Sequence, residues 1–193
     1  PPDGLLPRAP MPVRNGRIVR NRPYPFVLKV ASDDPNAGGK DVRICRHPLD
    51  LLRAERRLDG AETLIAEDFL AAPQNWCIYF AIRPGHAPAY LGGYTFADRG
   101  PPASAIELCR AIARSGADLG YRGLTGIDVL IDRSGRAFAI DPNFRPAAST
   151  GMVQHFGRLS RERGHACGRV AFCGYAGSLD GFLAGCRPGL KEG

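Results

Sequence analysis

The sequence lacks several features that mark whole classes of protein. Across its 193 residues no apolar run approaches the roughly 20 residues of a membrane-spanning helix, so we expect a soluble protein. The chain does not start with a basic segment followed by a short apolar stretch, so we expect no secretory signal and a cytoplasmic location. The net charge of +7 is spread over dispersed arginines, without a polybasic block or interleaved aromatic residues. This pattern favours small anionic ligands over nucleic acid.

Familiar motifs for zinc and for nucleotides are missing as well. The six cysteines form no CxxC pair and are interpreted as buried thiols. His165, Cys167 and Cys173 remain an alternative metal cluster, although a closed zinc site takes four ligands. Lys40 is followed by Asp41, which excludes a Walker P-loop, and no GxGxxG occurs. A nucleotide site in this chain must therefore use another architecture.

The hydrophobic pattern predicts an α+β fold. Expected strands are residues 26–30, 41–45, 63–67, 76–82, 90–96, 126–131, 136–141 and 170–173. Expected helices are residues 48–58, 103–119, 151–163 and a last one from residue 178. Residues 1–22, rich in Pro and Arg with little periodicity, are expected to be irregular. Because the first residue is Pro1 and not Met, we expect a processed chain or a fragment.

Two of these strands form a hairpin with one apolar side. If the turn at residues 132–135 is symmetric, Ile127 faces Ile140 and Val129 faces Phe138. That side is expected to pack inward.

The other side of the hairpin is acidic. Asp128 is expected diagonal to Asp141, at roughly 7–8 Å between backbones, with Asn143 and Arg145 continuing the alternation. Carboxylate and amide oxygens suit Mg²⁺ or Mn²⁺, which take further ligands from water and phosphates. Arg145 fits as a planar cation for a phosphoryl or carboxylate oxygen. The alternative is that both acids merely stand at strand ends and that residues 141–143 form a turn.

A lysine in an apolar strand supplies the complementary charge. Lys29 lies within the run 26–30, where an ammonium group is costly unless it meets an anion. Gly38 and Gly39 follow, and glycine lets backbone NH groups approach phosphates closely. Together with the hairpin, these residues predict a phosphate-bearing ligand bound with a divalent cation.

These parts resemble the ATP-grasp superfamily over about residues 25–150. The most specific piece runs from Gly126-Ile127-Asp128 to Asp141-Pro142-Asn143-Phe144-Arg145. The resemblance implies an α+β fold of two lobes, residues 23–70 and 71–193, whose antiparallel sheets clamp ATP. It also implies an ATP- and Mg²⁺-dependent ligase that joins a carboxylate to an amine through an acyl phosphate. The alternative is an ATP-binding lobe or fragment without turnover of its own.

The resemblance further implies roles for individual residues. Asp128, Asp141 and Asn143 would bind the metal, and Arg145 would contact the transition state. Lys29, Gly38 and Gly39 would surround the phosphates. The adenine would meet the segment that contains Glu67, Phe69 and Leu70, the ribose would meet Gln74 or Asn75, and the second substrate would meet Ser149 and Thr150.

Three departures from the family pattern affect these expectations. Asp141 stands where glutamate is usual, and the ribose position carries an uncharged amide. The family usually has a preceding domain with a further basic residue, so we expect a missing upstream domain or a homo-oligomer to complete substrate binding.

Overall fold

The computed structural model describes residues 4–31, 42–57, 63–72, 74–95, 100–147 and 149–164, with the single residues 168 and 178. The chain divides into two compact units, residues 1–158 and 159–193, and the described strands lie in the first. Several expected features lie outside the described residues: Gly38 and Gly39, the cluster of His165, Cys167 and Cys173, the strand at 170–173 and the helix beyond 178.

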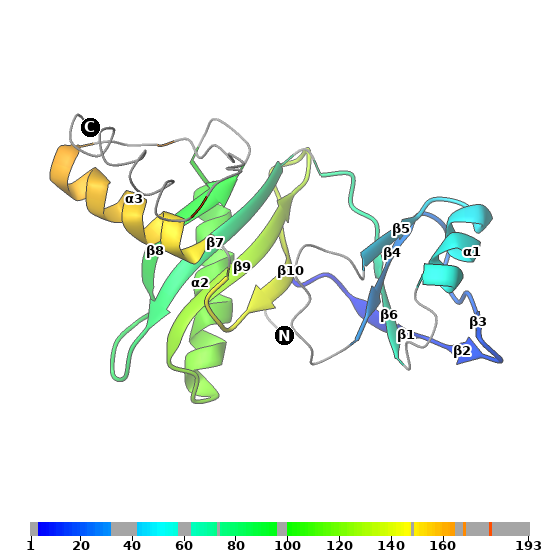
Figure 1. The fold of residues 1–193 in the computed structure, drawn as a ribbon. Helices are drawn as coiled ribbons and strands as arrows, with labels where there is room; N and C mark the ends of the chain where they lie inside the picture. The colour runs from blue at the N-terminus through cyan, green and yellow to red at the C-terminus, as the bar shows by residue number, and fades with distance from the viewer. Residues whose placement is uncertain are drawn as a thin grey trace. The chain divides into compact units, whose positions relative to one another are not determined.

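The first sheet has one face covered by a helix. β1 (Arg8–Met11), β4 (Phe26–Val30), β5 (Val42–Cys45) and β6 (Leu64–Asp68) pair in the antiparallel order β1-β6-β4-β5 (Figure 1). α1 (Pro48–Arg57) packs Leu51 and Ala54 onto this sheet, because alternate residues of the strands form its apolar face. The other members of the cluster are Met11, Ile18, Phe26, Leu28, Cys45, Leu64 and Ala66.

The expectation that residues 1–22 are irregular is wrong between Arg8 and Ile18. β1 pairs with β6, and β2 (Val13–Arg14) pairs with β3 (Arg17–Ile18) in a short hairpin. Asn15 and Gly16 have φ angles of 51° and 70°, the left-handed conformation of an Asn-Gly hairpin turn. The Asn-Gly pair is the sequence signal for this hairpin, whereas β1 leaves no periodic pattern.

The second sheet is built in the same way around a larger core. β7 (Gln74–Ile82), β8 (Ala89–Thr95), β9 (Gly123–Ile131) and β10 (Ala137–Asn143) pair in the antiparallel order β10-β9-β7-β8. α2 (Ala103–Asp118) covers one face of this sheet (Figure 1). The chain passes from the first sheet to the second between Asp68 and Gln74, where the expected lobe boundary at residue 70 falls.

α2 meets the sheet through an apolar stripe, and a further helix follows the last strand. The core cluster consists of Trp76, Ile78, Phe80, Ile82, Ala105, Cys109, Ile112, Ala113, Ile127, Val129, Ile131 and Ala139. α3 (Thr150–Arg163) buries Thr150 and Val153 near its start. None of the described helices is long and apolar enough to cross a membrane.

The register of the β9–β10 hairpin differs from the symmetric one. Asp132 Oδ1 accepts hydrogen bonds from the backbone NH groups of Ser134 at 2.8 Å and Arg136 at 3.0 Å, which closes a longer turn. Ile131 therefore pairs with Ala137. The predicted pairs are wrong as a result: Val129 faces Ala139, Phe138 faces Leu130, and Ile127 faces Pro142.

A β-bulge at Ile140 shifts the hairpin by one further residue. The register changes between Ala139 and Asp141, so Asp141 lies directly opposite Asp128 and not diagonal to it. Opposite residues of an antiparallel pair are about 4.5–5.5 Å apart at Cα, closer than the predicted separation.

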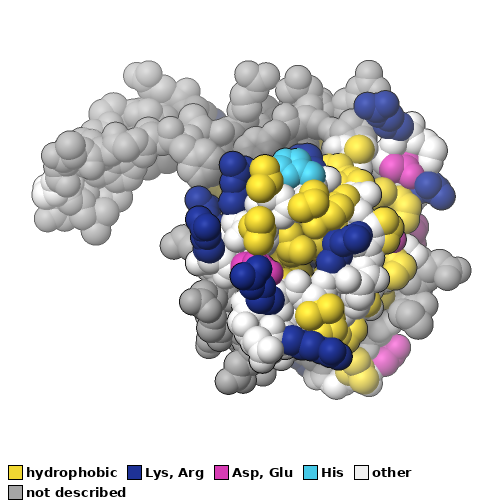
Figure 2. Space-filling view, turned by 90° about the vertical axis from the view of Figure 1, so that its right-hand side faces the viewer, with side chains coloured by type: hydrophobic (Ala, Val, Ile, Leu, Met, Phe, Trp, Pro, Cys, Tyr) yellow, Lys and Arg dark blue, Asp and Glu magenta, His cyan; other side chains and the backbone are white. Residues whose placement is uncertain are grey.

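Basic side chains are dispersed on the face that carries α1. Figure 2 shows this face, which lies to the right in Figure 1, with Lys and Arg side chains separated by hydrophobic ones. Leu49 and Leu52 of α1 are 58% and 44% exposed. This face of the described chain has no continuous basic stripe of the kind that would track a nucleic-acid backbone.

Gly116 provides a test of how α2 is fitted to the sheet. A Cβ atom at Gly116 would lie 2.1 Å from Cε1 of Phe144. Overpacking costs about 1–3 kcal/mol, against a gain of roughly 0.5–1 kcal/mol for replacing a helical glycine with alanine. We therefore expect Gly116→Ala to lower the free energy of unfolding by about 1–2 kcal/mol in denaturant titrations.

The matched control is Gly151→Ala in α3, where a Cβ atom would meet nothing within 4 Å. This change should be neutral or stabilising by up to about 1 kcal/mol. Wild-type stability of Gly116→Ala would contradict the packing of Phe144 against α2.

Candidate functional site

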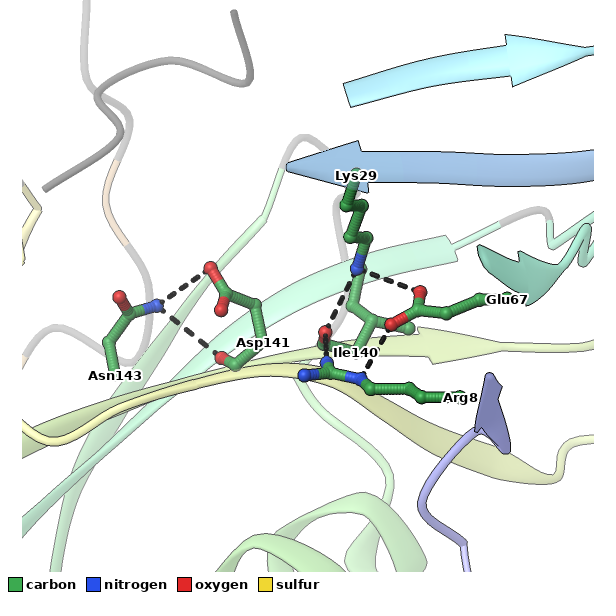
Figure 3. A network of polar contacts seen from close by, with 6 residues as sticks. All are labelled: Arg8, Lys29, Glu67, Ile140, Asp141 and Asn143. Atoms are coloured by element: carbon green, nitrogen blue, oxygen red, sulfur yellow. Dashed lines mark hydrogen bonds and ion pairs between the residues drawn. The ribbon is translucent and has the colours of Figure 1, made fainter. Parts of the chain in front are cut away.

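A row of polar side chains crosses the face of the second sheet opposite α2. Cys77 of β7 pairs with Asp128 of β9, which pairs with Asp141 of β10, so the three side chains share one face. Asp128 is half-buried and Asp141 is exposed. Asn143 lies two residues further on the same face, and its Nδ2 donates to Asp141 Oδ2 at 3.1 Å (Figure 3). The structure thus brings together the three predicted metal ligands.

Burial raises the pKa of Asp128 above its ordinary value. A hydrogen bond from the Cys77 thiol opposes this rise, the neighbouring charge of Asp141 adds to it, and the charge of Lys29 opposes it. Burial also raises the pKa of Cys77 and of Tyr79, so both keep their protons at neutral pH. A polar chain therefore runs from Ser149 through Tyr79 and Cys77 to Asp128.

The end of β10 is fixed from behind by two neighbours. Thr125, which is fully buried, donates its hydroxyl to the backbone carbonyl of Asn143 at 2.8 Å. Phe144 packs against Gly116 and meets the ring of Tyr121 edge-on, with centroids 5.1 Å apart. These contacts position the backbone of Asn143 beside Asp141, as a preorganised site requires.

In the first sheet, a buried carboxylate lies between two cations. Glu67 is only 1% exposed, and its Oε2 lies 2.7 Å from the Nζ of Lys29. Its Oε1 lies 2.7 Å from the Nε of Arg8. Lys29 comes from β4 and Arg8 from β1, the two strands on either side of β6 (Figure 3). Lys29, whose burial in an apolar strand requires an anionic partner, thus pairs with a carboxylate of the protein itself.

Both cations also bind the residue that precedes Asp141. The carbonyl of Ile140 accepts a hydrogen bond from Lys29 Nζ at 3.2 Å and another from the guanidinium of Arg8 (Figure 3). Ile140 is the bulge residue of β10 and lies outside the regular pairing with β9. The bulge therefore gives these cations an acceptor next to the acidic pair.

The face of the first sheet that α1 leaves uncovered is apolar around Lys29. Val27, Ile65 and Ile44 alternate onto this face through the registers of β4 with β6 and β5. Ile44 on this face is 40% exposed. Such a surface suits a flat, apolar ring.

The segment after β6 is held by local contacts. The guanidinium of Arg46 lies over the ring of Phe69, 5.4 Å from its centroid. The carbonyl of Leu70 accepts a hydrogen bond from the NH of Ala72 at 2.9 Å. Phe69 and Leu70 come two and three residues after Glu67, and their role in ligand binding stays a prediction.

Gln74 does not lie on the acidic face of the second sheet, and Arg145 lies beyond the last residue of β10. Gln74 shares the face of Trp76, and its Oε1 accepts a hydrogen bond from the indole NH at 3.4 Å. Asn75, the other residue considered for the same role, is exposed and lies on the face of Asp128. Arg145 is exposed beyond the end of β10, where it donates to the carbonyl of Pro146 at 3.4 Å.

The two residues considered for the second substrate differ. Ser149 is half-buried and contacts the hydroxyl of Tyr79. Thr150 is only 5% exposed, and its hydroxyl accepts a hydrogen bond from the NH of Ala147 at 2.8 Å. The Thr150 hydroxyl is therefore used in a hydrogen bond at the start of α3. Ser149 is the better candidate for a contact with the second substrate.

Sequence reasoning missed Arg8, Cys77 and Tyr79. The alternation of residues 76–82 contains the signal for Cys77 and Tyr79, since both fall on the face opposite Trp76. No local signal marks Arg8, whose position depends on pairing with β6 far along the chain.

The chain matches one protein family and shares its fold with solved structures. The family model described as L-aspartate–L-methionine ligase, ATP grasp, matches residues 13–143. An N5-carboxyaminoimidazole synthetase from Staphylococcus aureus complexed with ADP has a TM-score of 0.59 at 13% identity. An L-amino acid ligase from Bacillus licheniformis has a TM-score of 0.54 at 17% identity. A biotin carboxylase from Campylobacter jejuni has a TM-score of 0.53 at 18% identity.

The chain is shorter than each of these proteins. The similarity covers 82% of this chain and 43% of the synthetase, 79% and 38% for the amino acid ligase, and 76% and 39% for the carboxylase. At these identities the likeness is one of fold.

The raised pKa of Asp128 predicts how stability depends on pH. Because folding disfavours the ionised carboxyl, the penalty is present above the folded-state pKa and disappears below the unfolded value of about 3.9. We expect Asp128→Asn to raise the free energy of unfolding at about pH 7, and the gain to vanish near pH ~3. Urea titrations across this range measure the difference.

Asp118→Asn is the control for net charge, because Asp118 is exposed at the end of α2. It should not reproduce the gain. A loss of stability in Asp128→Asn at neutral pH would show that the ionised carboxylate stabilises the fold and would contradict this prediction.

Proposed function

Because the chain belongs to the ATP-grasp family, we propose that it forms the nucleotide-binding part of an ATP-dependent ligase that joins a carboxylate to an amine. The family match confirms the predicted membership of the ATP-grasp superfamily. The similar solved structures confirm the predicted α+β ATP-grasp fold. The activity of the whole protein and its substrates are part of the proposal.

One observation carries the proposal. Lys29 of the first sheet and the acidic pair of the second sheet meet at Ile140, whose carbonyl binds Lys29 and whose next residue is Asp141. A cation for phosphate and oxygen ligands for a metal are thus neighbours. This is the arrangement that a metal-bound polyphosphate requires.

The uncovered apolar face of the first sheet supports adenine binding. Val27, Ile44 and Ile65 offer a surface for the ring, and Glu67 offers carboxylate oxygens to an amino group. The backbone near Leu70 would meet the ring edge, and Gly38 and Gly39 would cover the phosphates. For the ribose we favour Asn75 over Gln74, because Asn75 lies on the acidic face.

The oxygen donors on β9 and β10 fit Mg²⁺ or Mn²⁺. Asp128 and Asp141 supply carboxylates from directly opposite positions, and Asn143 supplies an amide oxygen. A bound ion would neutralise charge on the transferred phosphoryl group. The hard oxygen set, with the Cys77 thiol protonated, is typical of such ions and not of zinc.

The proposed reaction transfers the γ-phosphoryl group of ATP to a carboxylate. The resulting acyl phosphate is attacked by an amine, which forms the amide and releases phosphate. Lys29 would stabilise the phosphates of ATP, and Arg145 would stabilise the transferring group and the later tetrahedral centre. The names of the family and of the Bacillus licheniformis ligase favour amino acids as both substrates.

A second candidate function is ATP binding without independent turnover. It is the alternative that the sequence left open, and the similarity covers 38–43% of the three similar structures. Under either function we expect substrate binding to be completed by a further domain or by a second copy. The proposed partners are ATP and small-molecule substrates, and the proposal includes neither nucleic acid nor a membrane as a partner.

Asp141→Ala tests the metal end of the site. We expect ATP with Mg²⁺ to raise the Tm of the wild type more than ATP alone does, and Asp141→Ala to lose this increment. Each tenfold loss of affinity removes about 1.4 kcal/mol of stabilisation, or roughly 3–6 °C for a chain of this size. Asp141→Glu, which restores the usual family residue, should keep the increment. If Mg²⁺-ATP raises the Tm of neither the wild type nor Asp141→Glu, both candidate functions are wrong.

Arg145→Ala separates ligase activity from simple binding. Loss of one donor to a developing charge typically lowers kcat about 10²–10³-fold. We expect that loss in phosphate release from amino-acid mixtures, with the Kd for ATP nearly unchanged. Arg133→Ala, at an exposed position of the hairpin turn, is the charge-matched control. Wild-type protein that binds Mg²⁺-ATP but releases no phosphate with any mixture would favour the second function.

A further inference from the structure

The buried carboxylate of Glu67 is ion-paired with two cations of the protein itself. Its side chain is 2% exposed, and each carboxylate oxygen lies 2.7 Å from a different cation. A buried carboxylate without a partner is strongly destabilised, so at least one cation must remain in place.

The contacts that Lys29 makes within the protein compete with binding to a polyphosphate. Its Nζ has three donors, of which one is directed at Glu67 and one at the carbonyl of Ile140. An ammonium group that turns toward phosphate oxygens gives up some of these contacts. The affinity for a polyphosphate therefore depends on what happens to Glu67 when Lys29 turns away.

We propose that Arg8 is a positioning residue that holds the charge of Glu67 while Lys29 engages the phosphates of the nucleotide. This inference rests on the proposed function. Arg8 is placed for the role because β1 pairs with β6 in a register that sets Arg8 directly opposite Glu67. It approaches from the side of β6 that is opposite to β4, so it need not move when Lys29 does (Figure 3).

The chemistry of the guanidinium group fits this role better than that of a second lysine. Its planar fork carries five donors and can bind both oxygens of one carboxylate. The Nε contact to Oε1 is an ion pair without aligned hydrogen-bond geometry, so Oε1 keeps accepting capacity. Arg8 also binds the carbonyl of Ile140, which anchors the guanidinium beside the acidic strand.

The test compares the affinities for ATP and for adenosine in single and double variants. We expect Arg8→Ala to raise the Kd for ATP about tenfold or more, because Lys29 becomes the sole partner of Glu67. The affinity of Arg8→Ala for adenosine, measured by displacement of ATP, should be close to that of the wild type, because adenosine has no phosphate for Lys29 to bind. In the Glu67→Gln background there is no buried charge to hold, so adding Arg8→Ala should change the Kd for ATP less than twofold.

Arg17→Ala is the control for net charge, since Arg17 is exposed in β3 and the change removes the same charge from the same part of the chain. Its Kd for ATP should match that of the wild type. If Arg8→Ala does not fold, Arg8→Gln carries the same test, and Arg8→Lys should recover part of the affinity.

Each other outcome is informative. An equal loss for ATP and adenosine, or a loss that persists in the Glu67→Gln background, overturns the inference, because Arg8 would then act on the ligand itself or on the fold. Unchanged ATP affinity in Arg8→Ala also overturns it and leaves the proposed function intact. If the wild type binds no ATP, the proposed function fails and this inference fails with it.

Discussion

A carboxylate buried between two cations is the interaction on which the described site depends. Glu67 lies on β6, which has β1 on one side and β4 on the other, so the order of the sheet supplies one cation from each neighbour. A charge in such a place must be paired, and the pairing fixes where the side chains of Lys29 and Arg8 lie. Because both cations also bind Ile140, the charge balance of the first sheet is connected to the acidic strand of the second.

That connection requires an irregular strand. A regularly paired Ile140 would have its carbonyl committed to β9, whereas the bulge leaves it free for the cations. The same bulge brings Asp141 opposite Asp128, where the charge of Asp141 adds to the rise in the pKa of Asp128. One irregularity thus has two effects, on the acceptor for Lys29 and on the spacing of the acids, which agrees with the frequent occurrence of bulges beside functional sites.

The same irregularity marks the limit of what the sequence predicts. Alternation and helical spacing place β4, β7 and α2 to within a few residues, because burial of one face leaves a local pattern. The register of the hairpin leaves none, since it is set by the bonds of Asp132 within its turn and by the bulge. The position of Arg8 likewise depends on pairing between segments far apart in sequence. The residue types of the acidic cluster, Asp128, Asp141 and Asn143, were thus predictable, whereas their spacing and the second cation were not.

The register also gives a physical reason why aspartate is tolerated at position 141. A carboxylate on a diagonal partner must span roughly 7–8 Å between backbones, where the extra methylene of glutamate helps. Directly opposite Asp128, the backbones are about 4.5–5.5 Å apart, so the shorter side chain has less distance to cover. Asn143 bonds to the Asp141 carboxylate and restricts its orientation. The bulge, the shorter acid and the neighbouring amide are therefore consistent with one another.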